Sequence, residues 1–326
     1  MYDITALGEL LIDFTPSGSQ ENGRVLFEQN PGGAPANVLA ALSKLQKKTA
    51  FIGKVGKDQF GFFLKNILDQ INVDTSGLVF SENANTTLAF VHLDDEGDRT
   101  FSFYRNPGAD TTLTIEDIDF ELIKNSKIFH FGSLSMTHNP AAETTLAAVT
   151  FAKENEVLIS FDPNLRESLW DSLDRAKEMM YKGLQSSDVV KISEEELIFL
   201  TGVSDLEEGT QILSDKYRVP LMFVTLGGNG SFFRLREKTG YIPGFVVDVQ
   251  DTTGAGDGFL GGVLYKILEK KCMIDSLTYE DLIEIGSFAN AIGALATTKK
   301  GAIGSMPALN EIHTLNTSTE VTKENI

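Results

Sequence analysis

Short apolar runs alternate with helix-length segments along most of this chain. Between positions 113 and 307, apolar runs recur at 127–131, 157–161, 189–192 and 221–226, and the stretches between them have helical character. Such alternation predicts βαβ units that build a mostly parallel sheet covered by helices. The 326 residues contain no internal repeat and no linker rich in Pro, Gly or Ser. We therefore expect one α/β domain across 1–326.

The N-terminal part of the chain predicts a strand followed by a helix. Residues 4–15 are largely apolar and are punctuated by Gly8 and Asp13, which suits one buried strand whose end delivers Asp13 to a cleft. A solvated aspartate at a strand end is the simpler alternative. After a turn at 31–33, residues 36–45 predict a helix. Gly32 and Gly33 let the backbone approach a ligand closely, and Asn37 offers a donor and an acceptor in the first helical turn.

Two alternating β runs at 87–93 and 99–104 are joined by the sequence DDEGD at 94–98, which is a hairpin signal. Together with the run at 24–30 they predict a small sheet made of segments near 14–31 and 86–106. A small sheet of this kind can act as a lid that excludes water from a site, although a plain surface hairpin explains the same pattern. Its exposed strand edges could also pair two subunits into a homodimer.

The stretch 251–264, DTTGAGDGFLGGVL, carries the clearest chemical signal. The glycines on either side of Ala255 let successive N–H groups point into one concavity, and the start of the following helix adds unpaired donors. Such a cradle suits a phosphate, or the charge that develops while a phosphoryl group moves. Asp257 stands where a carboxylate can accept a proton from an attacking hydroxyl. A glycine turn with a capping aspartate is the simpler alternative.

Three further segments follow predicted strands. FDPNLR at 161–166 offers Arg166, whose fork of donors suits a phosphate or a sugar oxygen. KISEEELIFLTG at 191–202 places three glutamates in a first helical turn, where capping alone explains most of them. VTLGGNGS at 224–231 can bring backbone close to a nucleotide, although a β-hairpin turn is an adequate explanation.

Composition narrows the classes of function. The formal net charge of −18 argues against a nucleic-acid surface, and no segment approaches the run of about 20 apolar residues that a membrane span requires. The N-terminus lacks the pattern of a signal peptide. Cys272 is the only cysteine, which excludes an internal disulfide and a cysteine-rich zinc site. We expect a cytoplasmic protein that binds small molecules.

Taken together, the motifs resemble one enzyme family. DTTGAGD with its glycine-rich helix, GGAPANV at 32–38, YRNPGAD at 104–110 and DPNLR at 162–166 are similar to signatures of the ribokinase-like (PfkB) carbohydrate kinases, and are closest to the fructokinase branch. The resemblance implies a three-layer α/β/α sandwich with a small β-sheet lid. It also implies ATP-dependent phosphorylation of a sugar primary hydroxyl, with fructose as the expected sugar. Asp257 would be the base, and Gly254, Ala255 and Gly256 would form the anion hole.

The same resemblance assigns residues to ligands. The sugar would lie against Asp13, Gly32, Gly33, Asn37, Arg105 and Arg166. ATP would be bound by Lys191, Glu196, Thr225, Gly227, Gly230 and Asn290, and Glu196 would help to hold Mg2+ through water. A monovalent cation such as K+ would lie among Asp251, Thr253, Ala296, Lys299, Gly301 and Ser305. In the family's Asn-x-x-Glu motif, Ser193 stands at the Asn position, which leaves the role of this serine open.

Other functions stay open at this point. Within the class, the substrate could be 2-keto-3-deoxygluconate, whose carboxylate Arg105 or Arg166 could bind, or it could be ribose or a nucleoside. A catalytically silent protein that senses a sugar or nucleotide belongs to another class, and the intact Asp257 argues against it. A nicotinamide-dependent oxidoreductase would need a G-x-G-x-x-G turn after an early strand, and the sequence has none there.

Overall fold

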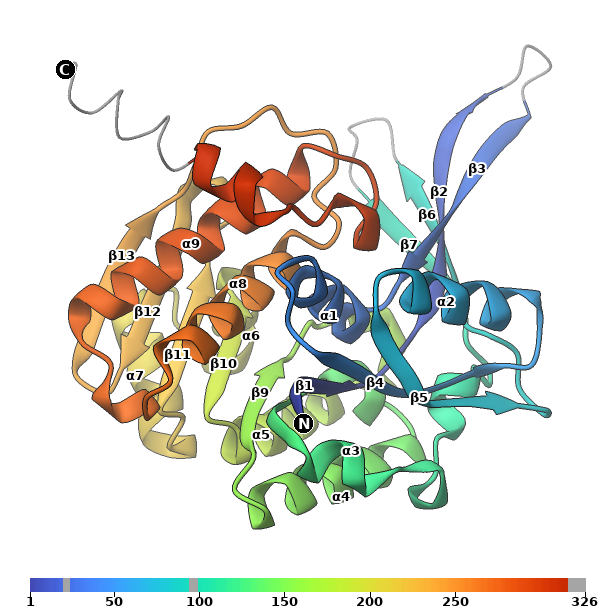
Figure 1. Cartoon of the computed structure of the whole chain (residues 1–326), viewed down its shortest axis with the longest axis horizontal. Coiled ribbons are helices and arrows are strands. Elements are labelled where there is room, and N and C mark those ends of the chain that lie inside the picture. Colours follow the sequence, from blue (N-terminus) through green and yellow to red (C-terminus); the bar gives the residue numbers. More distant parts are fainter. Residues whose placement is uncertain (20–23, 94–98, 316–326) are drawn as a thin grey trace.

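The computed structural model describes residues 1–19, 24–93 and 99–315, so the turn predicted at 94–98 lies outside the described residues. Within these ranges the strands form a nine-stranded sheet and a separate four-stranded sheet. Figure 1 shows helices on both sides of the large sheet, with the small sheet rising beside α2 (Gln59–Gln70).

The large sheet has the strand order β13-β12-β11-β10-β9-β8-β1-β4-β5. Its strands are β1 (Tyr2–Leu7), β4 (Thr49–Gly56), β5 (Val73–Ser81), β8 (Ser126–Gly132), β9 (Leu158–Asp162), β10 (Val189–Ser193), β11 (Leu221–Thr225), β12 (Gly230–Leu235) and β13 (Lys238–Pro243). Pairings from β11 to β5 are parallel, because helical crossovers join those strands. Strand β12 instead returns antiparallel through a glycine turn. The predicted, mostly parallel sheet is confirmed.

Helices on the two faces of the large sheet complete three layers (Figure 1). One face carries α1 (Ala34–Lys44), α2, α8 (Ala255–Lys270) and α9 (Tyr279–Thr297), and the other carries α3 (Phe120–Lys124), α4 (Ala141–Glu154), α5 (Leu173–Ser186), α6 (Glu194–Thr201) and α7 (Leu206–Tyr217). Each face has its own buried apolar cluster, around Leu39 and Val263 on one side and Leu184 and Leu197 on the other. None of the helices in the described ranges is long and apolar enough to cross a bilayer.

The small sheet has the order β3-β2-β6-β7. Its strands are β2 (Leu11–Ser19), β3 (Val25–Gly32), β6 (Leu88–Leu93) and β7 (Arg99–Tyr104). The prediction of one buried strand over 4–15 is wrong. The chain leaves the large sheet at Leu7 and enters the small sheet at Leu11, so Asp13 lies inside a strand, opposite Asn30. The apolar pattern hid the break because both halves are buried, and a continuous apolar run gives no sign of a change of sheet.

Candidate active site

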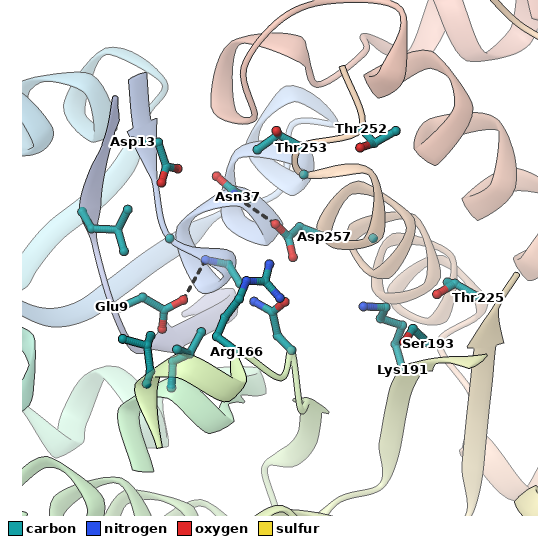
Figure 2. A pocket seen from close by; sticks show the side chains of 18 of the residues that line it. Glu9, Asp13, Asn37, Arg166, Lys191, Ser193, Thr225, Thr252, Thr253 and Asp257 are labelled. Atoms are coloured by element: carbon teal, nitrogen blue, oxygen red, sulfur yellow. Dashed lines mark hydrogen bonds between the residues drawn. The ribbon is translucent and has the colours of Figure 1, made fainter. Parts of the chain in front are cut away.

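A cavity of about 580 Å3 lies at the carboxyl ends of the parallel strands. The segments that follow β1, β8 and β9, together with the ends of β10 and β11, deliver Glu9, Leu134, Asn164, Ser193 and Thr225 to its wall. The small sheet closes one side with Leu11, Asp13 and Phe103. Open α/β sheets gather ligands at this edge because neighbouring crossovers diverge there. We call this space the polar cavity (Figure 2).

A second cavity, of about 440 Å3, adjoins the first. Its wall is made largely of glycine and apolar side chains, including Gly228, Phe245, Val246, Val249 and Ala294. We call it the apolar cavity. Thr225, Gly227, Thr252 and Gly256 line both spaces. The two cavities therefore meet at the N-terminal turn of α8.

That turn presents backbone amides to the junction of the cavities. Gly254 precedes α8 with a φ of 77°, a left-handed conformation that glycine adopts without strain. The amide of Ala255 donates to the Thr252 carbonyl at 3.3 Å, and the first N–H bond within the helix runs from Gly258 to Gly254 at 2.8 Å. The amides of Gly256 and Asp257 come before this first bond, so the helix offers them no carbonyl. Both are available to an anion at the positive end of the helix.

The carboxylate of Asp257 lies within hydrogen-bond reach of α1. Its Oδ2 accepts a hydrogen bond from Asn37 Nδ2 at 2.7 Å, which joins residues 220 positions apart (Figure 2). Burial raises the pKa of Asp257 to about 6, and the negative charge of Asp162 adds to this effect. Lys191, Asn37 and Arg166 oppose the rise. A buried carboxylate with such a pKa is ionised at neutral pH and still able to take a proton, as a general base must be.

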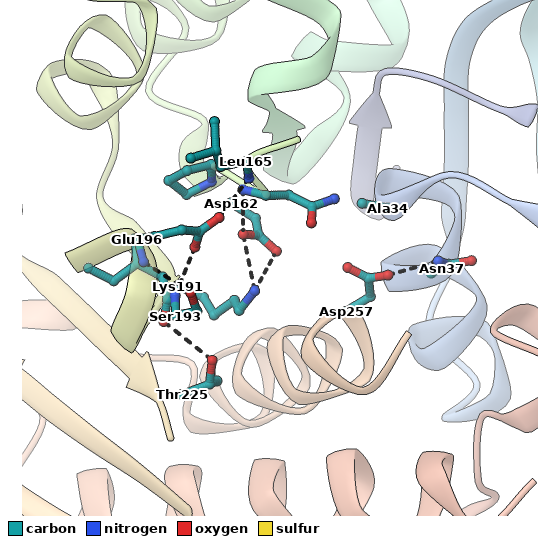
Figure 3. A network of polar contacts seen from close by, with 12 residues as sticks. Ala34, Asn37, Asp162, Leu165, Lys191, Ser193, Glu196, Thr225 and Asp257 are labelled. Atoms are coloured by element: carbon teal, nitrogen blue, oxygen red, sulfur yellow. Dashed lines mark hydrogen bonds and ion pairs between the residues drawn. The ribbon is translucent and has the colours of Figure 1, made fainter. Parts of the chain in front are cut away.

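A buried charge network lies beside the amide turn (Figure 3). Lys191 Nζ is 3.0 Å from Asp162 Oδ2, and a Cβ on Gly256 would lie 3.0 Å from the same ammonium. Burial alone would lower the pKa of Lys191, but the carboxylates of Asp162, Glu196 and Asp257 outweigh it and raise that pKa. The ammonium therefore stays charged next to the anion-binding amides.

The sequence matches the profile of the pfkB family carbohydrate kinases over residues 1–309. The chain belongs to the pfkB family of carbohydrate kinases. Fructokinase-1 of Zea mays is 43% identical over 311 residues, which cover 95% of this chain and 96% of that protein.

Solved structures of family members share the fold. The fructokinase of Xylella fastidiosa with bound ATP gives a TM-score of 0.90 at 36% identity and covers 98% of this chain and 100% of that chain. The fructokinase of Vibrio cholerae O395 in its fructose, ADP and calcium ion bound form gives 0.88 at 36% identity and covers 97% and 99%. A double mutant of the Vibrio protein was solved with fructose, ADP and potassium ion bound. The ribokinase-like fold predicted from the motifs is confirmed.

The structure brings most of the predicted sugar residues of this family member to the polar cavity. Asp13, Gly33, Asn37, Arg105 and Arg166 line it. Gly32 is not one of the lining residues. It contacts Asp13, and a Cβ at this position would collide with the Asp13 carboxylate. Burial raises the pKa of Asp13 to about 6; Arg166 opposes this rise, and the charges of Asp257 and Asp251 add to it.

The two arginines of this set differ in what they still offer a ligand. Arg105 donates from Nε to Asp110 at 2.7 Å, from Nη1 to Thr137 at 2.9 Å and from Nη2 to the Leu134 carbonyl at 2.9 Å. Its fork is thus engaged by protein oxygens on three sides. Arg166 donates from Nη1 to its neighbour's carbonyl, that of Leu165, at 3.0 Å, which leaves more of its guanidinium for a ligand.

The predicted ATP residues divide between the two cavities. Thr225 and Gly227 line both, Gly230 and Asn290 line the apolar cavity, and Lys191 lines the polar one. Glu196 lines neither of the two cavities. Its carboxylate accepts hydrogen bonds from the amides of Ser193 at 2.8 Å and Leu165 at 2.7 Å. Ser193 caps α6 and receives the Glu196 amide in return, a capping box. Ser193 at the family's Asn position is therefore a helix cap in this chain.

Part of the predicted cation set clusters at the loop before α8. Asp251 Oδ1 accepts from the amide and hydroxyl of Thr253 at 2.9 and 2.7 Å, and Oδ2 accepts from the Gly301 amide at 3.0 Å. The other members have separate contacts: Ala296 is buried in α9, Lys299 Nζ pairs with Glu311, and Ser305 Oγ donates to the Ala302 carbonyl.

Two acidic residues that line the polar cavity, Glu9 and the exposed Glu195, are not among the site residues that the sequence predicts. A signal for Glu9 existed, because Glu9 and Asp13 are the only charged residues in the apolar stretch 4–15. Charged side chains are almost never fully buried without a partner or a function. The pattern that indicates a site role for Asp13 therefore indicates one for Glu9 as well.

Proposed function

We propose that this carbohydrate kinase is a fructokinase, which transfers the γ-phosphoryl group of ATP to the primary hydroxyl of fructose and gives fructose 6-phosphate. One observation carries the proposal: a polar cavity and an apolar cavity meet at the amide turn, with the Asp257 carboxylate beside it. Two substrates held in these spaces would have their reacting groups at the junction. The fructokinase relatives support fructose as the sugar.

Asp257 would act as the general base in this reaction. Asn37 holds Oδ2, so Oδ1 is left to accept the proton of the sugar hydroxyl. The amides of Gly256 and Asp257, with the ammonium of Lys191, would stabilise negative charge on the phosphoryl oxygens as the group moves. Positioning and charge stabilisation account for most catalysis of phosphoryl transfer.

The apolar cavity suits the base of the nucleotide, since glycines and valines form a narrow slot beside the phosphate-binding amides. Within the described ranges no three His, Cys, Asp or Glu side chains are grouped so as to hold a metal ion. Mg2+ in kinases is usually bound by substrate phosphate oxygens and water, with one or two carboxylates. Glu196 would contribute through a bridging water, because backbone amides already occupy both of its oxygens. Bound Mg2+ would neutralise phosphate charge.

We also propose that a monovalent cation binds beside Asp251 and Thr253, with backbone oxygens near Gly301 completing the site. The potassium-bound Vibrio relative supports this assignment. Replacing K+ by tetramethylammonium at constant ionic strength should lower kcat several-fold. An unchanged rate in a cation-free buffer would contradict the site.

The charge of the polar cavity favours a neutral sugar over 2-keto-3-deoxygluconate. Glu9 and Asp13 place a buried and a half-buried carboxylate in its wall, and Arg105 is engaged by Asp110. A sugar acid would bring a further negative charge close to these carboxylates, and of the two arginines only Arg166 would be available to pair with it. ADP production measured over a panel of sugars tests the proposal: fructose should give the highest kcat/KM. Preference for the sugar acid, or turnover with no sugar in the panel, would overturn it.

The small sheet would serve as a lid and as the surface of a homodimer. Phe27 and Tyr104 are exposed on β3 and β7, at 39% and 66%, and among the described strands β3 is at the edge of the small sheet, where it could pair with another strand. Light scattering of the wild type and of Phe27→Ser tests the dimer, which the variant should weaken. The cytoplasmic location expected from the sequence stays a prediction, to be checked by cell fractionation.

A further inference from the structure

Glu9 lines the polar cavity, and one of its carboxylate oxygens is buried without a hydrogen-bond partner among the described residues. The residue lies in the connection between β1 and β2 and is 3% exposed. Its Oε1 accepts the Ala34 amide at 2.9 Å, whereas Oε2 has no hydrogen-bond partner among the described residues. Buried polar atoms are nearly always paired, and leaving one unpaired is unfavourable. A donor from outside the chain would remove this cost.

The surroundings of Glu9 hold it in one position. Gly33 has a φ of 122°, and a Cβ there would collide with the Glu9 carbonyl oxygen. Gly33, the N-cap residue of α1, has no side chain that could accept a hydrogen bond from the first amides of the helix. The Glu9 carboxylate instead accepts the hydrogen bond of the Ala34 amide. Backbone and side chain thus fix Glu9 to the start of α1, the helix that also carries Asn37. A fixed acceptor loses little freedom when a ligand binds.

No cation neutralises Glu9 directly among its described contacts. Burial raises the pKa of Glu9 to about 7; its amide contacts and the charge of Arg105 oppose this rise, and Asp110 adds to it. Arg105 directs its hydrogen bonds to Asp110, Thr137 and Leu134 instead. The carboxyl group therefore lacks an ion-pair partner, and in its ionised form, which predominates above about pH 7, Oε2 can accept from a hydroxyl donor.

We propose that Glu9 is a specificity-determining residue that accepts, through Oε2, a hydrogen bond from a sugar hydroxyl on the side of the ring remote from the reacting one. Figure 2 shows Glu9 and Asp257 projecting from different elements into the same pocket. With the primary hydroxyl at Asp257, the far side of the sugar lies toward Glu9. This assignment rests on the proposed sugar kinase function and names one contact by which the site selects a neutral polyol.

The test combines Glu9→Gln with deoxy sugars. The glutamine keeps an oxygen for the Ala34 amide and replaces Oε2 by an NH2 group. With fructose the variant should show a KM about 10-fold higher, the usual loss when a buried hydrogen bond is removed, with kcat and the KM for ATP within about twofold. Steady-state kinetics are then repeated with 1-deoxyfructose, 3-deoxyfructose, 4-deoxyfructose and 2,5-anhydro-D-mannitol.

One analogue should abolish the difference between the two enzymes. If Glu9 binds a given hydroxyl, wild type and variant have equal KM values for the sugar that lacks it, and the full difference persists with the others. Glu143→Gln, at an exposed glutamate of α4, is the control and should leave every KM unchanged.

Three results would overturn the assignment: an unchanged KM for fructose, an equal penalty with every analogue, or a fall in kcat together with a lower melting temperature. The last would mean that Glu9 only supports the α1 turn. If the wild type turns over another sugar but not fructose, the fructokinase proposal is wrong while the Glu9 proposal remains testable. The comparison of wild type and Glu9→Gln is then made with deoxy forms of that other sugar. If the wild type turns over no sugar, both proposals fall.

Discussion

The two cavities that meet at the α8 turn differ in how they can recognise a ligand. The polar cavity contains the carboxylates of Glu9 and Asp257, which are buried, and of Asp13, which is half-buried; desolvation raises the pKa values of Glu9, Asp257 and Asp13 to about 7, 6 and 6, respectively. Among the described residues, no acidic, basic or histidine side chain lines the apolar cavity. The polar cavity can thus bind a ligand through hydrogen bonds to carboxylates that are unfavourable to bury. The apolar cavity can bind a ligand through complementary shape and apolar contacts.

This difference explains why the sugar side should be the more sensitive to single substitutions. When a buried carboxylate and a ligand hydroxyl form a hydrogen bond, removing either partner leaves the other unpaired, which is unfavourable. In the apolar slot the contact is spread over many atoms, each contributing little. A substitution in one cavity should therefore change the KM of the substrate bound there and leave the KM of the other substrate unchanged.

The largest effect is expected from Asp257→Asn. Without a base, kcat should fall about 10²–10⁴-fold, the usual worth of positioned proton transfer. The melting temperature should not fall, because burial disfavours the ionised carboxylate that the asparagine replaces. A coupled assay for ADP and thermal unfolding measure the two. A variant that phosphorylates at the wild-type rate would exclude Asp257 as the base.

Asp13→Ala should act on the sugar side alone. Loss of a charged acceptor is expected to raise the KM for fructose about 10- to 100-fold, while the KM for ATP stays within about twofold. Steady-state kinetics with each substrate varied in turn provide the measurement. Equal changes in both KM values would mean that Asp13 supports the whole site instead of the sugar half.

The rate of the reaction and the binding of the nucleoside should also differ in their dependence on pH. Because the pKa of Asp257 in the free enzyme is raised to about 6, the base is ionised above that pH and protonated below it, so kcat/KM for fructose should fall by at least about tenfold for each pH unit below pH 6. Binding of adenosine, which has no phosphate to titrate, should stay flat between pH 5.5 and 8. Calorimetry with adenosine and a pH–rate profile measure both. A kcat/KM that holds to pH 5 would contradict the raised pKa.

The smallest effect is expected in the apolar cavity. A Cβ at Gly228 would meet no atom within 4 Å, so Gly228→Val should fold normally and place its side chain at the nucleotide slot. The KM for ATP should rise by about three- to tenfold, and the KM for fructose should not change. If the sugar KM rises instead, the nucleotide does not lie in this cavity.

The sequence determined those features whose physical cause is local. The alternation of apolar runs and helices required a parallel sheet, and the Gly254–Gly256 turn with its left-handed residue set the amides at the start of α8. GGAPANV likewise set a glycine turn before α1. These signals depend on φ, on periodicity and on helix capping, which a few neighbouring residues control.

Only the tertiary structure decided which groups meet. The hydrogen bond between Asn37 and Asp257, the engagement of Arg105 by Asp110, Thr137 and Leu134, and the unpaired Oε2 of Glu9 depend on where distant elements pack. The same holds for the break after Leu7, which puts Glu9 between two sheets and Asp13 inside the second. Burial and partner geometry come from contacts across the whole chain, so local pattern could name the acidic residues of this site but could not tell which of them needed a ligand.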